Sequence, residues 1–172
     1  VNAISFGKGG EVSVDPLNLP EETMAKMAEE FTLIFTGTSR SASEVLSKGA
    51  DDSLIETTNL GRIREQADMA RDLLECADLS GLGSLLNEAW QMKRGISSAV
   101  SNDILDDLYE SIMSSGATGA KLLGAGGGGF FLVHGNAALR DNLAEILDDE
   151  HRMIPLGIDN SGSTIIFDDS GK

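Results

Sequence analysis

The chain has 172 residues, with 28 acidic and 13 basic side chains, and therefore a formal net charge of −15 at pH 7. This charge argues against nucleic acid or a membrane surface as a partner, and no apolar run approaches the length of a membrane span. Apolar residues make up 41% of the chain, enough for a single domain over residues 1–172 with its own core. The lone Cys76 cannot form an internal disulfide, so we expect a reducing compartment, the cytoplasm.

The N-terminal part of the chain predicts a hairpin, a helix and a strand. Residues 3–6 and 11–17 flank a glycine-rich turn, and apolar and polar side chains alternate as in a strand. Pro20 and two acidic residues begin a helix that runs to about Glu30. The apolar residues 31–35 then predict a short buried strand.

Three helical patterns fill the middle of the chain. Apolar residues recur at spacings of three and four along residues 60–74, and again along residues 82–96 after a cap at residues 78–80. A third helix begins with caps at residues 102 and 103. We expect these three helices to pack as a small antiparallel bundle. The inward positions of the third helix are predicted to be Ile104, Leu105, Leu108 and Ile112.

The C-terminal part of the chain predicts further strands and one helix. Residues 117–123 and 130–134 form strand-like runs on either side of a glycine tract. Residues 136–147 predict a helix whose inward side chains are Leu139, Leu143 and Ile146. Residues 153–158 and 163–167 predict a closing hairpin. The fold class that follows is α+β, with a mainly antiparallel four-stranded sheet covered on one face by helices and a small helical bundle.

The glycine tract is the most unusual stretch of the sequence. Five of the six residues 124–129 are glycine, which is costly because glycine loses the most backbone entropy on folding. Glycine supplies positive φ angles and lets a bare main chain approach a ligand, and successive amides can cradle an anion, most often phosphate. We therefore favour a ligand-proximal loop. A plain turn between two strands is the alternative.

Two known glycine patterns fit the tract poorly. A Walker loop needs Lys-Ser or Lys-Thr after the last glycine, but here Phe130 follows. Gly124, Gly126 and Gly129 match the dinucleotide pattern G-x-G-x-x-G literally. That pattern opens a helix, whereas the residues after Gly129 predict a strand. A dinucleotide-binding domain would require a helix at this point.

A second candidate ligand segment follows the strand at residues 31–35. Residues 36–43 join a glycine turn to a hydroxyl-rich helix start that carries Arg40. Exposed amides and hydroxyl groups at such a start suit an anion, and a guanidinium adds several donors. An ordinary Ser/Thr cap with a solvated arginine is the alternative.

Residue types that would support a metal or catalytic centre are scattered. His134 and His151 are the only histidines and lie apart in the sequence. The acidic clusters at residues 106–107 and 148–150 lack the spacing of a calcium loop. We predict no metal site and no catalytic residue within this chain.

Four segments together resemble the GHMP kinases, the superfamily of galactokinase, homoserine kinase and mevalonate kinase. Residues 121–131, with the glycine tract, are similar to the C-terminal glycine motif of these enzymes. Residues 35–43, 87–94 and 157–163 resemble segments of one branch, the D-glycero-D-manno-heptose 7-phosphate kinases and close sugar kinases. The likeness covers nearly the whole chain in the same order. Nothing matches the N-terminal domain of these kinases, so we expect the chain to begin mid-protein.

The resemblance implies the C-terminal, substrate-binding half of an ATP-dependent sugar kinase acting on a heptose phosphate or a related sugar. An N-terminal kinase domain, absent from this chain, would carry the main ATP loop, the acidic catalytic group and the Mg²⁺ ligands. The chain alone is expected to be inactive and could form a homo-oligomer through its exposed domain seam. The alternative is a stand-alone small-ligand-binding or regulatory domain without catalysis. By resemblance, the nucleotide phosphates would lie near Gly124, Ala125, Gly126, Gly127, Gly128 and Gly129, and the sugar phosphate near Gly37, Ser39, Arg40, Lys93 and Lys121.

Overall fold

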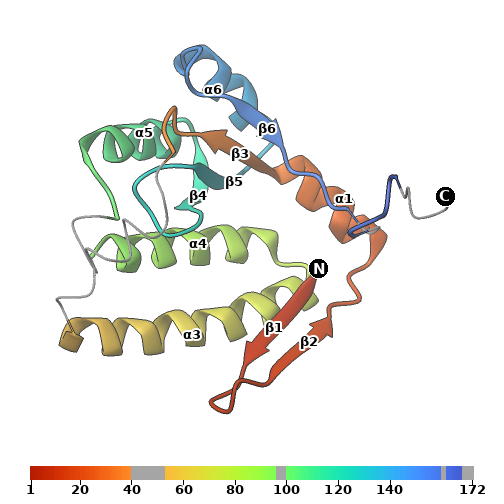
Figure 1. Cartoon of the computed structure of the whole chain (residues 1–172). Helices are drawn as coiled ribbons and strands as arrows, with labels where there is room; N and C mark the ends of the chain where they lie inside the picture. Colours follow the sequence, from red (N-terminus) through yellow and green to blue (C-terminus); the bar gives the residue numbers. More distant parts are fainter. Residues whose placement is uncertain (40–52, 96–99, 160–161, 168–172) are drawn as a thin grey trace.

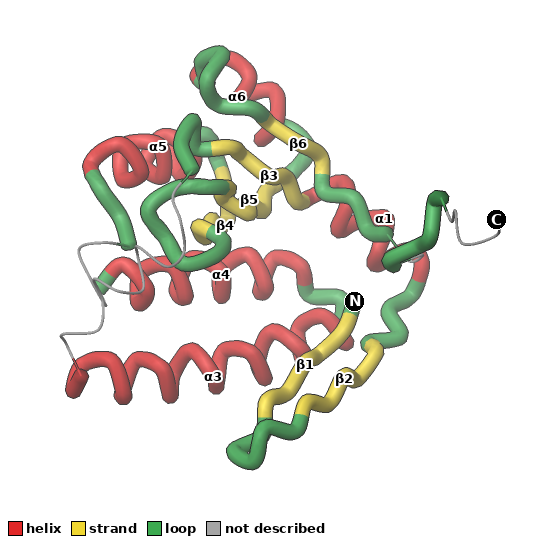
Figure 2. The backbone as a smooth tube through the Cα atoms, viewed as in Figure 1, coloured by secondary structure: helices red, strands yellow, loops and turns green. Residues whose placement is uncertain are grey.

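The computed structural model describes residues 1–39, 53–95, 100–159 and 162–167. Figures 1 and 2 show an N-terminal hairpin beside a layer of helices and a larger sheet. The elements in chain order are β1 (Asn2–Phe6), β2 (Val12–Pro16), α1 (Glu21–Glu30), β3 (Phe31–Phe35), α3 (Ser53–Glu75), α4 (Leu79–Arg94), α5 (Asp103–Ser114), β4 (Ala117–Leu122), β5 (Phe130–Gly135), α6 (Leu139–Ile146) and β6 (Met153–Pro155).

The larger sheet has four strands in the order β4-β5-β3-β6, and every pairing is antiparallel. Phe35 lies opposite Phe130, and Lys121 lies opposite Leu132. The predicted α+β class with a four-stranded antiparallel sheet is therefore confirmed. The order also places β4 and β5, which flank the glycine tract, next to each other.

The main core lies on one face of this sheet. Successive strand residues point to opposite faces, so Ile34 and Phe131 enter the core while Leu33 and Phe130 lie on the other face. The ring of Trp90 meets that of Phe131 edge-on at 5.5 Å between centroids, an arrangement that aromatic pairs prefer. The buried members of this core are Ile34, Trp90, Val100, Leu105, Leu108, Tyr109, Ile112, Ala120, Leu122, Phe131, Val133, Leu139 and Leu143.

Helices α4 and α5 begin where the sequence predicts caps. An oxygen of Asp78 accepts a hydrogen bond from the Gly81 amide at 2.8 Å, and Asn102 accepts one from the Leu105 amide at 3.1 Å. These bonds satisfy amide groups that a helix start leaves without a partner. Helices α3 and α4 lie side by side and run in opposite directions (Figure 1). Helix α5 packs on β4 and reaches α4 through the side chain of Tyr109, so the expected three-helix bundle is reduced to the pair α3 and α4.

Close approach of two backbones fixes α4 against β4. A Cβ atom added to Gly119 would lie 1.9 Å from the carbonyl oxygen of Gly83. A Cβ atom added to Gly83 would lie 2.6 Å from Nδ1 of His134 on β5. Glycine at both positions therefore lets α4 lie directly on the strands, and the C-terminal end of α4 reaches the glycine tract.

Three details of the sequence prediction are wrong. Ile104 and Ile146 were expected to face inward, but both are exposed: the exposed fraction is 63% for Ile104 and 51% for Ile146. Ile104 lies at the edge of the apolar stripe in the first turn of α5, and Ile146 is the last residue of α6. Residues 163–167 form no strand, and β6 pairs with β3 instead of a C-terminal neighbour. Strand β6 is therefore the outermost strand of the sheet, with β3 as its one described neighbour.

Within the described ranges, no helix combines the length and apolar character that crossing a membrane requires.

Candidate functional site

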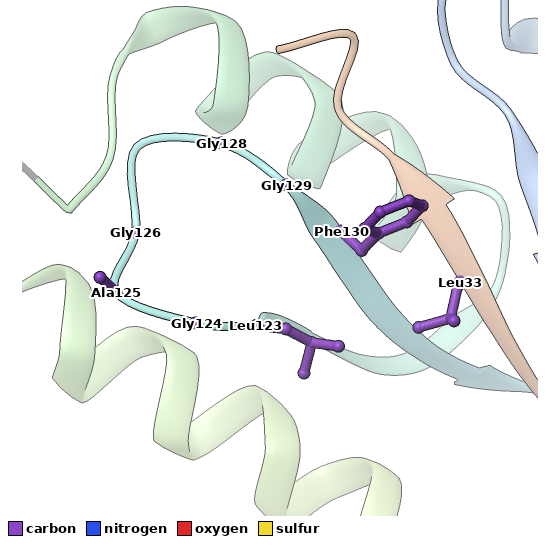
Figure 3. Close-up of a pocket in the computed structure, with 8 residues that line it drawn as sticks. All are labelled: Leu33, Leu123, Gly124, Ala125, Gly126, Gly128, Gly129 and Phe130. Carbon is purple, nitrogen blue, oxygen red and sulfur yellow. The ribbon is translucent and has the colours of Figure 1, made fainter. Parts of the chain in front are cut away.

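The glycine tract forms an open loop that joins the end of β4 to the start of β5 (Figure 3). All five of its glycines have positive φ, in the region that residues with a side chain rarely adopt. The values are 72° for Gly124, 119° for Gly126, 73° for Gly127, 151° for Gly128 and 112° for Gly129. The expectation that backbone geometry explains the glycines is therefore confirmed. Because β5 begins at Phe130, the helix that a dinucleotide-binding loop requires is not there.

Two other segments hold this loop in place. The Gly129 amide donates to the carbonyl oxygen of Thr38 at 2.9 Å and to the hydroxyl of Thr36 at 3.0 Å. The Thr36 amide in turn donates to the Gly129 carbonyl oxygen at 2.9 Å. On the other side, the Gly127 amide donates to the carbonyl oxygen of Val100 at 2.9 Å. The tract is thus anchored to the segment after β3 and to the residues that precede α5.

The anchoring segments come close enough to exclude side chains from the loop. A Cβ atom at Gly126 would lie 2.9 Å from the Val100 oxygen, and one at Gly128 would lie 2.8 Å from the Thr38 oxygen. Several loop amides nevertheless remain available. Within the described ranges, no acceptor is bonded to the amides of Gly124, Ala125, Gly126 and Gly128. A ligand with acceptor oxygens could bind them.

The loop borders a hollow of about 330 Å³. Figure 3 shows Leu33, Leu123 and Phe130 beside the arc of the loop. These side chains lie on the sheet face opposite the main core and give the hollow an apolar floor. A second hollow, of about 650 Å³, shares Phe130 with the first and includes Gly37. Its polar side chains are Asp149, Glu150 and Arg152.

Two half-buried lysines stand beside the loop. The ammonium of Lys93 on α4 donates a hydrogen bond to the carbonyl oxygen of Gly124. Burial lowers the pKa of Lys93 to about 8, and the positive charge of Lys121 on β4 adds to this shift. Burial also lowers the pKa of Lys121. Both effects disfavour the charged forms of these side chains in the absence of an anion.

The face of α4 next to Lys93 has a structural role. Arg94 forms an ion pair with Asp106 at 3.0 Å and lies over the rings of Trp90 and Tyr109. Trp90 is completely buried, and Tyr109 donates from its hydroxyl to Asn87. These contacts join α4 to α5. They hold the helix in the orientation that turns Lys93 toward the loop.

The other predicted site residues are placed as follows. Gly37, with a φ of 73°, lines the second hollow and Ser39 is exposed, while Arg40 lies outside the described residues. His134 contacts Glu30 at 3.2 Å and the ring of Phe31, which is a structural environment. Within the described ranges, no three side chains gather that could hold a metal ion.

Sequence reasoning missed three partners of the loop: Thr36, Thr38 and Val100. The two threonines belong to the hydroxyl-rich segment that is a candidate anion site by sequence, and in the structure the Thr36 hydroxyl and the Thr38 carbonyl oxygen both accept from the Gly129 amide. Val100 carries no local signal, because it contributes a carbonyl group that every residue has.

Residues 69–151 match the protein family described as GHMP kinases C terminal. This part of the chain is a GHMP kinase C-terminal domain. The chain is also 29% identical over 153 residues to a D-glycero-alpha-D-manno-heptose 7-phosphate kinase of Campylobacter jejuni, covering 87% of this chain and 44% of the relative. The chain therefore spans less than half the length of this curated relative.

Two solved structures share the fold of the GHMP domain. A mevalonate kinase from L. major in complex with R-mevalonate has a TM-score of 0.61 and 21% identity, over 84% of this chain and 44% of that one. A D-glycero-D-manno-heptose 1-phosphate kinase from Bacteroides thetaiotaomicron has a TM-score of 0.59 and 19% identity, over 90% of this chain and 40% of that one. The family match over residues 69–151 confirms the predicted resemblance to the GHMP kinases there, and these structures show the shared fold.

Proposed function

We propose that the intact protein is an ATP-dependent sugar kinase, and that this chain forms its substrate-binding half. The reaction would transfer the γ-phosphoryl group of ATP to a hydroxyl group of a heptose phosphate or a related sugar. The observation that carries the proposal is the anchored glycine loop with unbonded amides, within a GHMP kinase C-terminal domain. The similarity to a heptose 7-phosphate kinase supports the choice of substrate class.

Phosphoryl transfer depends on positioning and on stabilisation of negative charge, so a domain can contribute without a covalent step. In the proposed enzyme, the amides of residues 124–129 lie along the nucleotide phosphates. Lys93 and Lys121 lie on the acceptor side, and Gly37, Ser39 and Arg40 contact the sugar phosphate. Amide and ammonium donors fit phosphate oxygens, which accept charge-assisted hydrogen bonds.

The described residues suit phosphate better than they suit a metal ion. No carboxylate lines the hollow beside the loop, and Mg²⁺ requires oxygen ligands such as carboxylates. We therefore assign the Mg²⁺ ligands, most ATP contacts and the catalytic group to an N-terminal kinase domain. A Mg²⁺ ion held by that domain would neutralise part of the phosphate charge. A cytoplasmic location belongs to the same proposal, since ATP and a lone cysteine both favour it.

The N-terminal hairpin supports the proposal of a partner domain. In its register, Ile4 lies opposite Val14 and Phe6 lies opposite Val12, so all four side chains share one face. This face is open: 54% of Ile4, 79% of Phe6, 57% of Val12 and 54% of Val14 is exposed. A two-stranded hairpin is marginally stable by itself and needs a packed face. We propose that the N-terminal domain covers it.

The test compares this chain with the gene product that includes the upstream domain. Both are assayed for ADP release with ATP, Mg²⁺ and a panel of sugars and sugar phosphates. We expect turnover by the longer protein with a heptose phosphate, and none by this chain. Turnover by the isolated chain at an ordinary enzyme rate would contradict the division of roles. If the longer protein binds a sugar phosphate but phosphorylates nothing, the regulatory alternative is correct.

A further inference from the structure

The second hollow lies on the sheet face opposite the main core, beside the end of β3. Its aromatic wall consists of Phe35 on β3 and Phe130 on β5, which lie opposite each other in the sheet. Their ring centroids are 5.2 Å apart, with 47° between the ring planes, and both side chains are half-buried. Because the two rings pack against each other, a flat base cannot insert between them. They form one apolar wall that a ligand can lie against.

Three charged side chains border the same hollow, and all of them come from the segment that joins α6 to β6. The Phe35 amide donates to the carbonyl oxygen of Arg152 at 2.8 Å, so Arg152 lies next to Phe35 in the sheet. A side-chain oxygen of Asp148 accepts a hydrogen bond from the Glu150 amide at 3.0 Å. This bond fixes the turn that carries Asp149 and Glu150. The sheet and the turn thus hold the backbone of all three lining residues.

The hydrogen-bonding groups of this hollow are available to a ligand. Among the described residues, no ion pair involves Asp149, Glu150 or Arg152. Two carboxylates and one guanidinium give the hollow an excess of negative charge, which disfavours a phosphate group. An uncharged ligand with several hydroxyl groups fits better, because hydroxyls donate to carboxylates and accept from a guanidinium.

We propose that the second hollow binds the hydroxyl-bearing carbon skeleton of a sugar. Asp149 and Glu150 accept hydrogen bonds from its hydroxyl groups, and Arg152 donates to them. The C–H groups of the sugar ring lie against the wall made by Phe35 and Phe130, where burial of apolar area adds to the affinity. The volume of about 650 Å³ is within the range of small-molecule sites. The identity of this sugar as the phosphoryl acceptor rests on the proposed kinase function.

The position of the second hollow suits an acceptor. Phe130 directly follows Gly129, the last residue of the loop, and lines both hollows. On another side, a Cβ atom added to Gly37 would lie 3.7 Å from Cβ of Glu150. A sugar in the second hollow therefore lies between the segment after β3 and the loop whose amides are proposed to line the nucleotide phosphates. Transfer to a sugar hydroxyl requires such a juxtaposition of donor and acceptor.

The first experiment measures sugar binding by the longer protein in the absence of ATP, so the result does not depend on turnover. The probes are mannose, which carries the ring hydroxyls of a manno-heptose, and mannose 6-phosphate, both followed by NMR titration. Asp149→Asn and Glu150→Gln should each weaken binding of both probes about 5-fold, because a hydrogen bond to a carboxylate is stronger than one to a neutral amide. Glu145→Gln is the matched control: it removes the same charge from an exposed residue on α6 outside the hollow and should leave binding unchanged.

The inference is overturned if the wild-type protein binds neither probe, or if both variants bind the probes as tightly as the control. Circular dichroism and urea denaturation check that the variants remain folded. In the kinase assay, the same substitutions should raise KM for the sugar substrate about 5-fold and leave KM for ATP unchanged. A rise in KM for ATP alone would assign the hollow to the nucleotide and overturn the inference. Sugar binding that requires these residues, without turnover of any sugar, would refute the kinase function and leave the sugar site standing.

Discussion

Replacing Gly126 by alanine tests whether the loop conformation is built into the fold. The φ angle of Gly126 is 119°, and an added Cβ atom would lie 2.9 Å from both Cα and the carbonyl oxygen of Val100. These are backbone atoms, so the contact cannot be relieved by rotating a side chain. Holding a residue with a side chain in such a conformation costs about 1–3 kcal/mol. Moving the loop away would break the bond from the Gly127 amide to Val100, worth about 0.5–1.5 kcal/mol.

We therefore expect Gly126→Ala to lower the free energy of unfolding of this chain by about 1–3 kcal/mol if the loop keeps its conformation, and by about 0.5–1.5 kcal/mol if the loop moves and loses the bond. Urea denaturation measures the effect, as a lower midpoint with an unchanged slope. Gly124→Asn is the control: its φ of 72° lies in the left-handed region that asparagine tolerates, and nothing lies within 4 Å of an added Cβ atom. In the longer kinase, Gly126→Val should also raise KM for ATP or lower kcat. A Gly126→Ala chain as stable as the Gly124→Asn control would refute the reasoning.

Three further predictions concern charge and exposed surface. Burial lowers the pKa of Lys93 from 10.5 to about 8, so between these values the unfolded chain binds more protons and the free energy of unfolding rises with pH. Lys93→Met should flatten this rise, as measured by urea denaturation below pH 8 and above pH 10.5; an unchanged rise would contradict burial of the ammonium. Arg140 donates to the carbonyl oxygens of Ala28 and Phe31 at 2.7 and 2.8 Å, so Arg140→Met should lower the free energy of unfolding by about 1.5–3 kcal/mol. Arg62→Met, at an exposed position, should change it by less than about 0.5 kcal/mol, and equal effects would show that the Arg140 contacts contribute nothing. Phe6→Ser should reduce self-association of this chain in sedimentation velocity without loss of stability, because 79% of Phe6 is exposed; unchanged association would exclude the hairpin face as the contact.

Much of the fold could be predicted because its signals are local. Helix caps at Asp78 and Asn102 depend on residues within three positions, and both are observed. The glycine content of residues 124–129 predicted positive φ angles, and all five glycines have them. Where the signal depended on distant partners, prediction failed. Residues 163–167 have the composition of a strand, but a strand forms only where a neighbour pairs with it, and these residues pair with no described strand.

In the candidate site, too, local features could be predicted and contacts between distant segments could not. The sequence pointed to the glycine tract and to Lys93 and Lys121 as separate features, with roles taken from a resemblance. It did not show that Lys93 bonds to the tract or that the charge of Lys121 helps to lower the pKa of Lys93. It also did not show that Thr36 and Thr38 hold the loop. Thr36 lies 93 residues before Gly129 in the chain, and the pairing of β3 with β5 brings the two together.

The sequence by itself determined the kinds of elements, their caps and the need for a bare backbone at residues 124–129, because these follow from the properties of each residue and its near neighbours. Only the tertiary structure decided which carbonyl groups anchor the loop and which cations stand beside it. Strand order and the glycine contact between α4 and β4 bring those groups together. Contacts of this kind depend on how distant segments pack, and no local pattern records them.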